Sequence, residues 1–320
     1  MDKLLEINNL AIAFEDERGR FFRAVDDVSF DIREGEVLGL VGESGSGKSV
    51  TALSILRLLP QPTSRVEQGG ILYKGRDILT MPLPDLYKLR GGEISMIFQE
   101  PMAALSPLKT IGGQMVETVR FHRDMSVKEA RALSVRWLEK VWIEDPERQM
   151  KAFPYELSGG MQQRVMIAMA LMTEPGLMIA DEPTTALDVT VQAEIFRLLK
   201  ELRTHNNSIL LITHDMGAVN TMCDRVMIMY AGNLVETAAK DAIFRHPLHP
   251  YTQGLIKSMP RLNRRLQRLE TIPGQVPSIF NYPQGCRFRD RCPKAFGKCV
   301  ENPSFFEVEP GHQAACFLYA

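Results

Sequence analysis

Residues 42–49 read Gly-Glu-Ser-Gly-Ser-Gly-Lys-Ser and lie between a short apolar run, 37–41, and a helix-like segment, 49–59, that Pro60 ends. A buried strand, a glycine-rich turn and a helix in this order form a phosphate-binding loop, because the glycines let successive backbone N–H groups point at anionic oxygens. The helix start adds the positive end of its dipole. Taken alone, this loop predicts binding of a nucleoside triphosphate. The residues expected to bind it are Gly42, Ser44, Gly45, Ser46, Gly47, Lys48 and Ser49.

A second apolar run, 177–180, ends in two carboxylates, Asp181 and Glu182. Strand-end carboxylates lie at the crevice where open α/β sheets bind their ligands. Asp181 is expected to hold Mg²⁺ together with the Ser49 hydroxyl, while Lys48 reaches the β- and γ-phosphates. Glu182 is expected to polarise the attacking water as a general base. For these two residues by themselves, a solvated acidic pair is a strong competing interpretation.

A third motif, Leu-Ser-Gly-Gly-Met-Gln-Gln-Arg at residues 157–164, places a serine at an N-cap position ahead of two glycines. Such a helix start exposes backbone N–H groups and can bind a second phosphate. Because the loop at 42–49 already provides one phosphate site, the second predicts a nucleotide held between two subunits. A helix cap with a glycine hinge is the simpler alternative for this motif alone.

In their combination the motifs resemble those of the ABC ATPases, and in particular the ATP-binding subunits of oligopeptide and dipeptide permeases. The resemblance covers essentially all 320 residues and rests on residues 42–49, Gln99, residues 157–164, Asp181 with Glu182, Asp188 and His214. It implies ATP hydrolysis that drives import of di- or oligopeptides through closure and reopening of a head-to-tail ATPase dimer. The same motor in an importer of nickel chelates, glutathione or another small solute is the alternative. A non-transport ABC ATPase is a remoter one.

The resemblance also assigns roles to single residues. Gln99 is expected to contact Mg²⁺ and the attacking water, and His214 to grip the γ-phosphate and position Glu182. Phe14 matches the aromatic that stacks on adenine, with Phe22 as a rival and a core aromatic as the alternative. The residues implied to face the nucleotide of the partner subunit are Ser158, Gly159, Gly160, Gln162 and Asp188.

Partners and location follow from the same resemblance. It implies a second ABC ATPase subunit, with a paralogue favoured, two membrane-spanning permease subunits and an extracytoplasmic solute-binding protein. The chain has no stretch of 18 apolar residues, and its start lacks the features of a signal peptide. We therefore expect it at the cytoplasmic face of the inner (plasma) membrane, bound through the membrane subunits. Its 38 basic and 39 acidic residues balance, which argues against a nucleic-acid partner.

The fold class is predicted to be α/β, because strand-like runs alternate with helical ones. We expect a P-loop NTPase core of the RecA-like type with a mostly parallel sheet, preceded by an antiparallel β subdomain. A helical subdomain is expected as an insertion at about 90–165 of an ABC ATPase domain spanning 1–245. A shift to Pro-, Arg- and then Cys-rich composition marks a C-terminal extension at 246–320.

Four of the five cysteines lie in that extension, at Cys286, Cys292, Cys299 and Cys316. Four thiols in a short segment are typical of sites for iron–sulfur clusters or Zn²⁺. The spacing alone does not choose the metal. The resemblance favours a [4Fe–4S] cluster, with Zn²⁺ and unliganded thiols or disulfides as alternatives. The fifth, Cys223, is expected to be a small buried hydrophobic residue.

Overall fold

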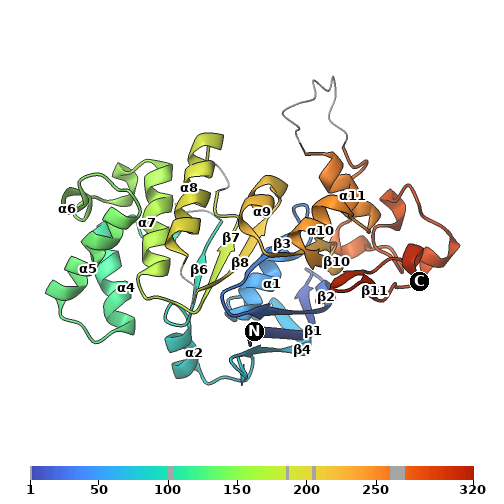
Figure 1. Ribbon diagram of the computed structural model, residues 1–320. Coiled ribbons are helices and arrows are strands. Elements are labelled where there is room, and N and C mark those ends of the chain that lie inside the picture. The colour runs from blue at the N-terminus through green and yellow to red at the C-terminus, as the bar shows by residue number, and fades with distance from the viewer. Residues whose placement is uncertain (1, 100–103, 185–186, 204–206, 260–270) are drawn as a thin grey trace. The chain divides into compact units, whose positions relative to one another are not determined.

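A computed structural model describes residues 2–99, 104–184, 187–203, 207–259 and 271–320 (Figure 1). The chain divides into two compact units. The first combines Met1–Thr80 with Leu211–Ala320, and the second is Met81–Leu210. Strand β8 (Ser208–Thr213) carries the chain from the second unit back into the first. None of the helices in the described ranges is long and apolar enough to cross a membrane.

An antiparallel sheet opens the first unit. Its strand order is β2-β1-β4-β5. Apolar residues of β1 such as Leu5 and Ile12 are fully buried, and they pair with Tyr73 of β4 and Val25 of β2. A polar hairpin turn joins the first two strands, where Asp16 accepts hydrogen bonds from the backbone N–H groups of Arg18 and Arg20. The strands are β1 (Lys3–Glu15), β2 (Phe21–Arg33), β4 (Ser64–Tyr73) and β5 (Arg76–Asp77).

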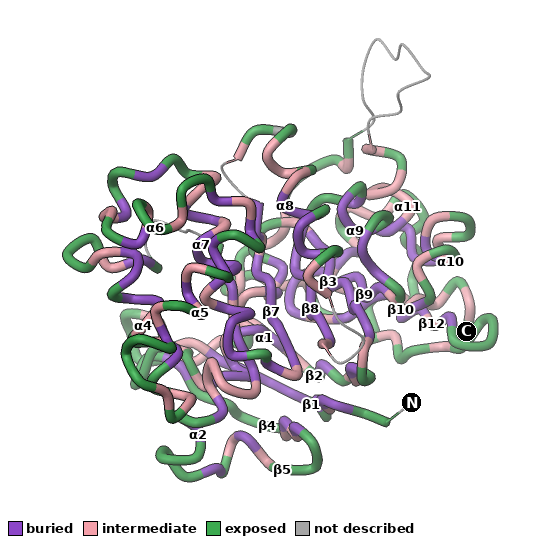
Figure 2. Tube along the Cα trace, turned by 60° about the vertical axis from the view of Figure 1, so that its left-hand side comes forward, coloured by how far each residue is buried: buried purple, intermediate pink, exposed green. Residues whose placement is uncertain are grey.

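A second group of strands in this unit combines parallel and antiparallel pairs. β3 pairs in parallel with β9, and β9, β10, β12 and β11 then follow one another in antiparallel pairs. All five residues of β3 are buried, as its unbroken apolar run predicts (Figure 2). The strands are β3 (Val37–Val41), β9 (Arg225–Tyr230), β10 (Asn233–Ala239), β11 (Phe306–Glu309) and β12 (His312–Ala314).

Short helices complete the first unit. The α-helices are α1 (Lys48–Ile55), α9 (Met216–Met222), α10 (Lys240–Arg245) and α11 (Pro250–Lys257). After α11 the described chain forms the single 3₁₀ turns η2 (Ile279–Asn281), η3 (Arg289–Arg291), η4 (Gly297–Val300) and η5 (Phe317–Tyr319). β12 adds to the edge of β10, so the end of the chain extends the sheet that holds β3.

The second unit contains a parallel strand pair and most of the helices. β6 (Ile94–Ile97) pairs with β7 (Leu177–Asp181), with Ile97 opposite Ala180. Ser126 and Glu129 stand at the spacing that predicts a capping box, and the structure confirms it: the Ser126 side chain accepts from the Glu129 N–H and the Glu129 side chain accepts from the Ser126 N–H. The helices are α2 (Leu83–Leu89), α4 (Ile111–His122), α5 (Val127–Lys140), α6 (Pro146–Gln149), η1 (Pro154–Glu156), α7 (Gly159–Leu171) and α8 (Val189–Leu202).

Both units mix strands with helices, and parallel pairs occur in each. The predicted α/β class is therefore confirmed.

Candidate nucleotide-binding site

The predicted phosphate loop, residues 42–49, connects β3 to α1 in the first unit. Two of its positions require glycine. A Cβ built on Gly42 would lie 2.1 Å from the carbonyl oxygen of Met229. Gly47, the N-cap of α1, has a φ of +104°, and a Cβ there would lie 2.8 Å from the Met229 side chain. The turn is therefore closed to any side chain at these two points.

Lys48 turns back onto this loop. Its Nζ donates to the carbonyl oxygens of Gly42, at 2.8 Å, and Glu43, at 2.9 Å. The residue is only 4% exposed, and a buried ammonium is costly unless it is hydrogen-bonded. An anionic phosphate is a stronger partner for such a group than a neutral carbonyl. The loop thus holds a desolvated cation at the first residue of α1, where a phosphate could take over its bonds.

The remaining loop residues differ in exposure. Ser44 and Gly45 face solvent, Ser49 is half-buried and Ser46 is fully buried. The Ser46 carbonyl accepts a hydrogen bond from the Gly232 N–H at 2.8 Å. The loop is therefore fixed by a backbone hydrogen bond at Ser46, while Ser44 and Gly45 remain accessible to solvent.

In the second unit the ends of β6 and β7 bring two predicted residues together. The Nε2 of Gln99 lies 3.4 Å from Oε2 of Glu182, a long hydrogen bond. Asp181, the last residue of β7, is 4% exposed. Glu182 has a φ of +46°, which is uncommon for a residue other than glycine. Strained backbone of this kind occurs preferentially at functional sites. This carboxylate is held in an unusual conformation beside an amide.

The motif at residues 157–164 forms the predicted capped helix start. Ser158 is the N-cap of α7, and its hydroxyl accepts from the Met161 N–H at 3.3 Å. Gly159 is exposed, and a Cβ on Gly160 would lie 3.1 Å from the side chain of Val191. The exposed backbone at Ser158 and Gly159 leaves this helix start accessible from solvent.

Gln162 has contacts that the sequence pattern does not reveal. The residue is 4% exposed, and its Nε2 donates to the carbonyls of Pro154 and Leu157 at 2.9 and 3.1 Å. In this structure the side chain fastens the segment that leads into Ser158. Gln162 therefore stabilises the residues that lead into the N-cap of α7.

Two further predicted residues lie at the starts of helices. Asp188 is the N-cap of α8, and its Oδ1 accepts from the N–H groups of Thr190 and Val191, both at 3.0 Å. His214 follows β8 in the first unit and is exposed. The next residue, Asp215, caps α9. Both Asp188 and His214 are thus accessible to solvent. The backbone around each is fixed by a helix cap, that of α8 at Asp188 and that of α9 at Asp215.

Phe14 and its rival Phe22 are cross-strand partners on β1 and β2. Directly opposite residues of an antiparallel pair share one face of the sheet, so both rings belong to the same surface. Both are half-buried. Phe22 additionally packs edge-on against Phe280, with ring centroids 4.8 Å apart.

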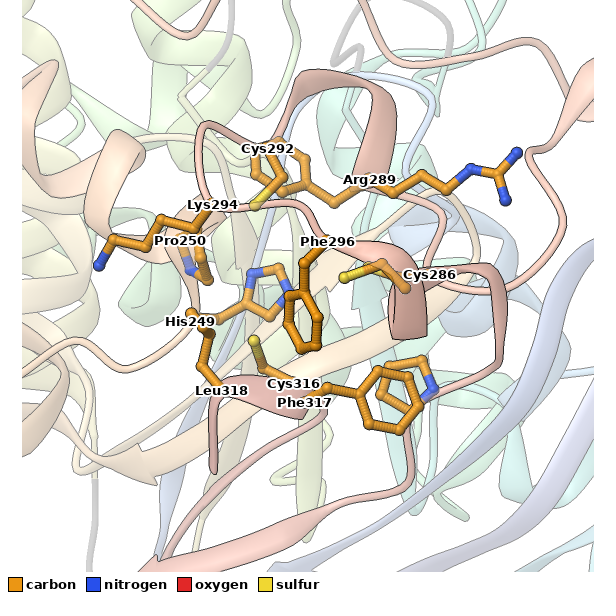
Figure 3. A pocket seen from close by; sticks show the side chains of 13 residues that line it. His249, Pro250, Cys286, Arg289, Cys292, Lys294, Phe296, Cys316, Phe317 and Leu318 are labelled. Atoms are coloured by element: carbon orange, nitrogen blue, oxygen red, sulfur yellow. The ribbon is translucent and has the colours of Figure 1, made fainter. Parts of the chain in front are cut away.

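The four cysteines of the C-terminal extension line one pocket with His249 and three phenylalanines, Phe288, Phe296 and Phe317. Cys286, Cys292 and Cys316 point into it (Figure 3). All five cysteines are free thiols. In the described part of the chain, no three His, Cys, Asp or Glu side chains are arranged to hold a metal ion. The four cysteines that the sequence grouped therefore line the same pocket, where they are free thiols.

Burial raises the pKa of three of these thiols. It raises the pKa of Cys286 to about 11, and the other three cysteines raise this pKa further through charge repulsion. Burial also raises the pKa of Cys292 and of Cys316. Cys223 lies apart at the end of α9 with 3% exposure, and burial raises its pKa to about 12. Its predicted role as a small buried hydrophobic residue is confirmed.

Comparisons with known proteins agree over the whole chain. Residues 25–185 match the ABC transporter family, and residues 235–299 match the C-terminal region of oligopeptide/dipeptide transporters. The chain is 49% identical to the oligopeptide transport ATP-binding protein AppD of Bacillus subtilis, over 100% of this chain and 98% of that protein. It is 47% identical to the oligopeptide transport ATP-binding protein OppD of Salmonella typhimurium, over 98% and 93%.

Solved structures agree with this. A dimeric ATP-binding cassette in a post-hydrolysis state with bound ADP and Pi superposes with a TM-score of 0.66 at 28% identity, covering 74% of this chain and 98% of that one. The cbiO1 protein of Clostridium perfringens, part of an ABC transporter complex, gives a TM-score of 0.64 at 26% identity, covering 77% and 92%. The chain therefore belongs to the ABC transporter family of ATP-binding proteins, in its oligopeptide/dipeptide branch.

Proposed function

We propose that this chain is the ATP-hydrolysing subunit of an importer for di- and oligopeptides. The observation that carries the proposal is the joining of an ABC cassette, 25–185, to an oligopeptide-type C-terminal region, 235–299, in one chain whose nucleotide motifs are intact. The full-length relatives with peptide-transport names support the cargo. We assign the ATPase domain to residues 1–245, with its helical part at about 90–165, and the extension to 246–320.

In this proposal the residues of each unit have distinct tasks. Lys48 gives up its hydrogen bonds to the carbonyls of Gly42 and Glu43 and binds the β- and γ-phosphates of ATP instead. The turn at Gly47 leaves room for the phosphate chain. Ser49, Gln99 and Asp181 supply the hydroxyl, amide and carboxylate oxygens that Mg²⁺ prefers. Glu182 takes a proton from the attacking water, and Gln99 and His214 orient that water and the γ-phosphate. Phe14 stacks on the adenine.

A second ATPase subunit completes the site. Ser158, Gly159 and Asp188 are exposed, which suits contact with the nucleotide of a partner. ATP held this way binds the closed dimer better than the open one, so it shifts the population towards closure, and hydrolysis reopens the dimer. We propose a paralogue as this partner, two permease subunits that receive the motion and an extracytoplasmic solute-binding protein. The chain then works at the cytoplasmic face of the inner (plasma) membrane.

The cargo is tested by uptake into proteoliposomes that contain the full transporter and its binding protein. We expect ATP-dependent accumulation of labelled di- to pentapeptides, with unlabelled peptides competing and nickel chelates or glutathione failing to compete. A matched preparation with ADP in place of ATP measures leakage. Accumulation of a nickel chelate or of glutathione, with peptides inert, would assign the same motor to another solute.

We also propose that Cys286, Cys292, Cys299 and Cys316 hold a [4Fe–4S] cluster, with Zn²⁺ as the alternative. The donor set fits, because four thiols from separate turns line one pocket, and their thiolate forms would repel one another unless a cation is bound between them. Binding would require the thiols to lose their protons and to move into coordination distance. A bound cluster would cross-link the four segments of the extension.

Anaerobic purification of the chain is expected to give about four irons and four sulfides per chain. Cys292→Ser should lower both to near background, whereas Cys223→Ser, which alters a thiol outside the pocket, should leave them unchanged. Iron and sulfide analysis with visible absorption measures the result. Stoichiometric zinc without iron would select the alternative ion, and neither metal would leave the pocket as a packed group of thiols.

A further inference from the structure

The phosphate loop is held by residues that lie more than 200 positions later in the chain. Glu43, the second residue of the loop, accepts two hydrogen bonds from Arg291, from Nη1 to Oε1 and from Nη2 to Oε2, both at 3.1 Å. Two parallel N–H···O bonds are the strongest arrangement for this pair of groups. The Arg291 side chain is 8% exposed, so the ion pair is partly shielded from water.

Arg291 is itself firmly placed. Its Nε donates to the Pro273 carbonyl at 2.7 Å, and Nη1 donates to the Tyr230 hydroxyl at 3.3 Å. Longer bonds run from Nη2 to the carbonyls of Ile272 and Gly274. A guanidinium with this many fixed acceptors loses little freedom when it binds a carboxylate. It therefore acts as a rigid anchor for Glu43.

Glu43 is also held through its backbone. Its N–H donates to the Tyr251 hydroxyl of α11 at 2.8 Å, and its carbonyl accepts from Lys48 at 2.9 Å. Tyr251 is fully buried against Tyr230. One residue of the loop thus joins the extension to the lysine that is expected to bind phosphate.

A second arginine secures the other side of the loop. Arg287 donates to the Ala231 carbonyl and to Oδ2 of Asp26, each at 2.5 Å. The neighbouring Gly232 N–H donates to the carbonyl of Ser46 in the loop. The two arginines stand one residue from Cys286 and Cys292, so the segment that carries these cysteines holds the loop at Glu43 directly and at Ser46 through residues 231–232.

We infer that Arg291 is a positioning residue for nucleotide binding, which acts through Glu43 to hold the phosphate loop and Lys48 in a binding-competent conformation. The consequence is that nucleotide affinity depends on the C-terminal extension. This inference rests on the proposed role of the loop in binding ATP.

The test measures MgADP affinity of the full-length chain by isothermal titration calorimetry. Arg291→Gln is expected to raise Kd about tenfold, within the range of typical coupling between sites. Arg291→Lys should restore affinity in part, since an ammonium can pair with Glu43 but cannot bond both oxygens in parallel. In the assembled transporter, KM for ATP should rise while kcat changes less than twofold. The matched control is Arg289→Gln, since this arginine of the same turn bonds Asp290 and the Gln284 carbonyl instead of Glu43 (Figure 3).

Glu43→Ala removes the same link from the loop side and leaves every residue of the extension unchanged. It should weaken MgADP about as much as Arg291→Gln, and the double variant should be no weaker than either single one. Wild-type affinity in both single variants, or fully additive losses, overturns the inference. Lys48→Ala serves as the reference for the loop itself. If Lys48→Ala also binds MgADP normally, the proposed nucleotide site is wrong; if it alone loses binding, only the role of Arg291 fails.

Discussion

Replacing Glu182 by glutamine is expected to lower steady-state ATP hydrolysis by the assembled transporter about a thousandfold, while ATP binding survives. An amide of the same size keeps the packing at the end of β7 but cannot take a proton from water. The local geometry supports this role. Glu182 directly follows the buried Asp181, has a φ of +46°, and has the Gln99 amide 3.4 Å from its carboxylate.

The measurement is phosphate release under saturating MgATP, with retained nucleotide counted after rapid gel filtration. The variant should trap ATP, because the closed dimer forms but cannot reopen by hydrolysis. Glu201→Gln is a matched control, as this carboxylate on α8 is 56% exposed and lies in the same unit. Hydrolysis within about threefold of the wild-type rate would remove Glu182 from the position of general base.

Local patterns predicted much of this molecule because their physics is local. The glycine turn at 42–49 sits between a buried strand and a helix, Ser158 caps α7, and Ser126 with Glu129 forms a capping box. Each depends on residues within a few positions of one another. The burial of Cys223 was predicted from its residue type, since a free cysteine behaves as a small hydrophobic residue.

Contacts between residues far apart in the sequence could not be predicted from such local patterns. Glu43 was part of the predicted loop, yet nothing near it in sequence indicates that its partner is Arg291, 248 residues later. Gln162 is expected to face the nucleotide of a partner subunit, and nothing in the motif indicates that its Nε2 also donates to the carbonyls of Pro154 and Leu157. Spacing placed the four cysteines together without revealing how far burial would raise the pKa of Cys286.

Glu236 is another residue that the sequence did not single out, and it is buried at the root of the extension. It lies on β10, is fully buried, and accepts from the N–H groups of Leu248 and His249, both at 2.8 Å. The Nε2 of His312, on the adjacent strand β12, lies 2.8 Å from the same carboxylate. The Glu236 carboxylate therefore bonds both the backbone N–H groups before α11 and the His312 side chain of β12.

Glu236→Ala is expected to lower the free energy of unfolding by about 3–5 kcal/mol, the usual cost of removing one partner of a buried charged group. The alanine leaves the Leu248 and His249 N–H groups and the His312 ring without their acceptor. Glu236→Gln should cost less, about 1–3 kcal/mol, because its amide nitrogen faces donors at one of the two oxygen positions. Urea unfolding followed by circular dichroism measures both.

Glu307→Ala is the comparison that isolates burial from charge. This glutamate on β11 also accepts a backbone N–H, that of Gly311, but it is exposed, so water can replace the lost bond. It should cost less than about 1 kcal/mol. If Glu236→Ala were no more costly than Glu307→Ala, the Glu236 contacts would not be what fastens the extension. A large difference would mean that the buried carboxylate of Glu236, through its bonds to Leu248, His249 and His312, fastens the extension to β10.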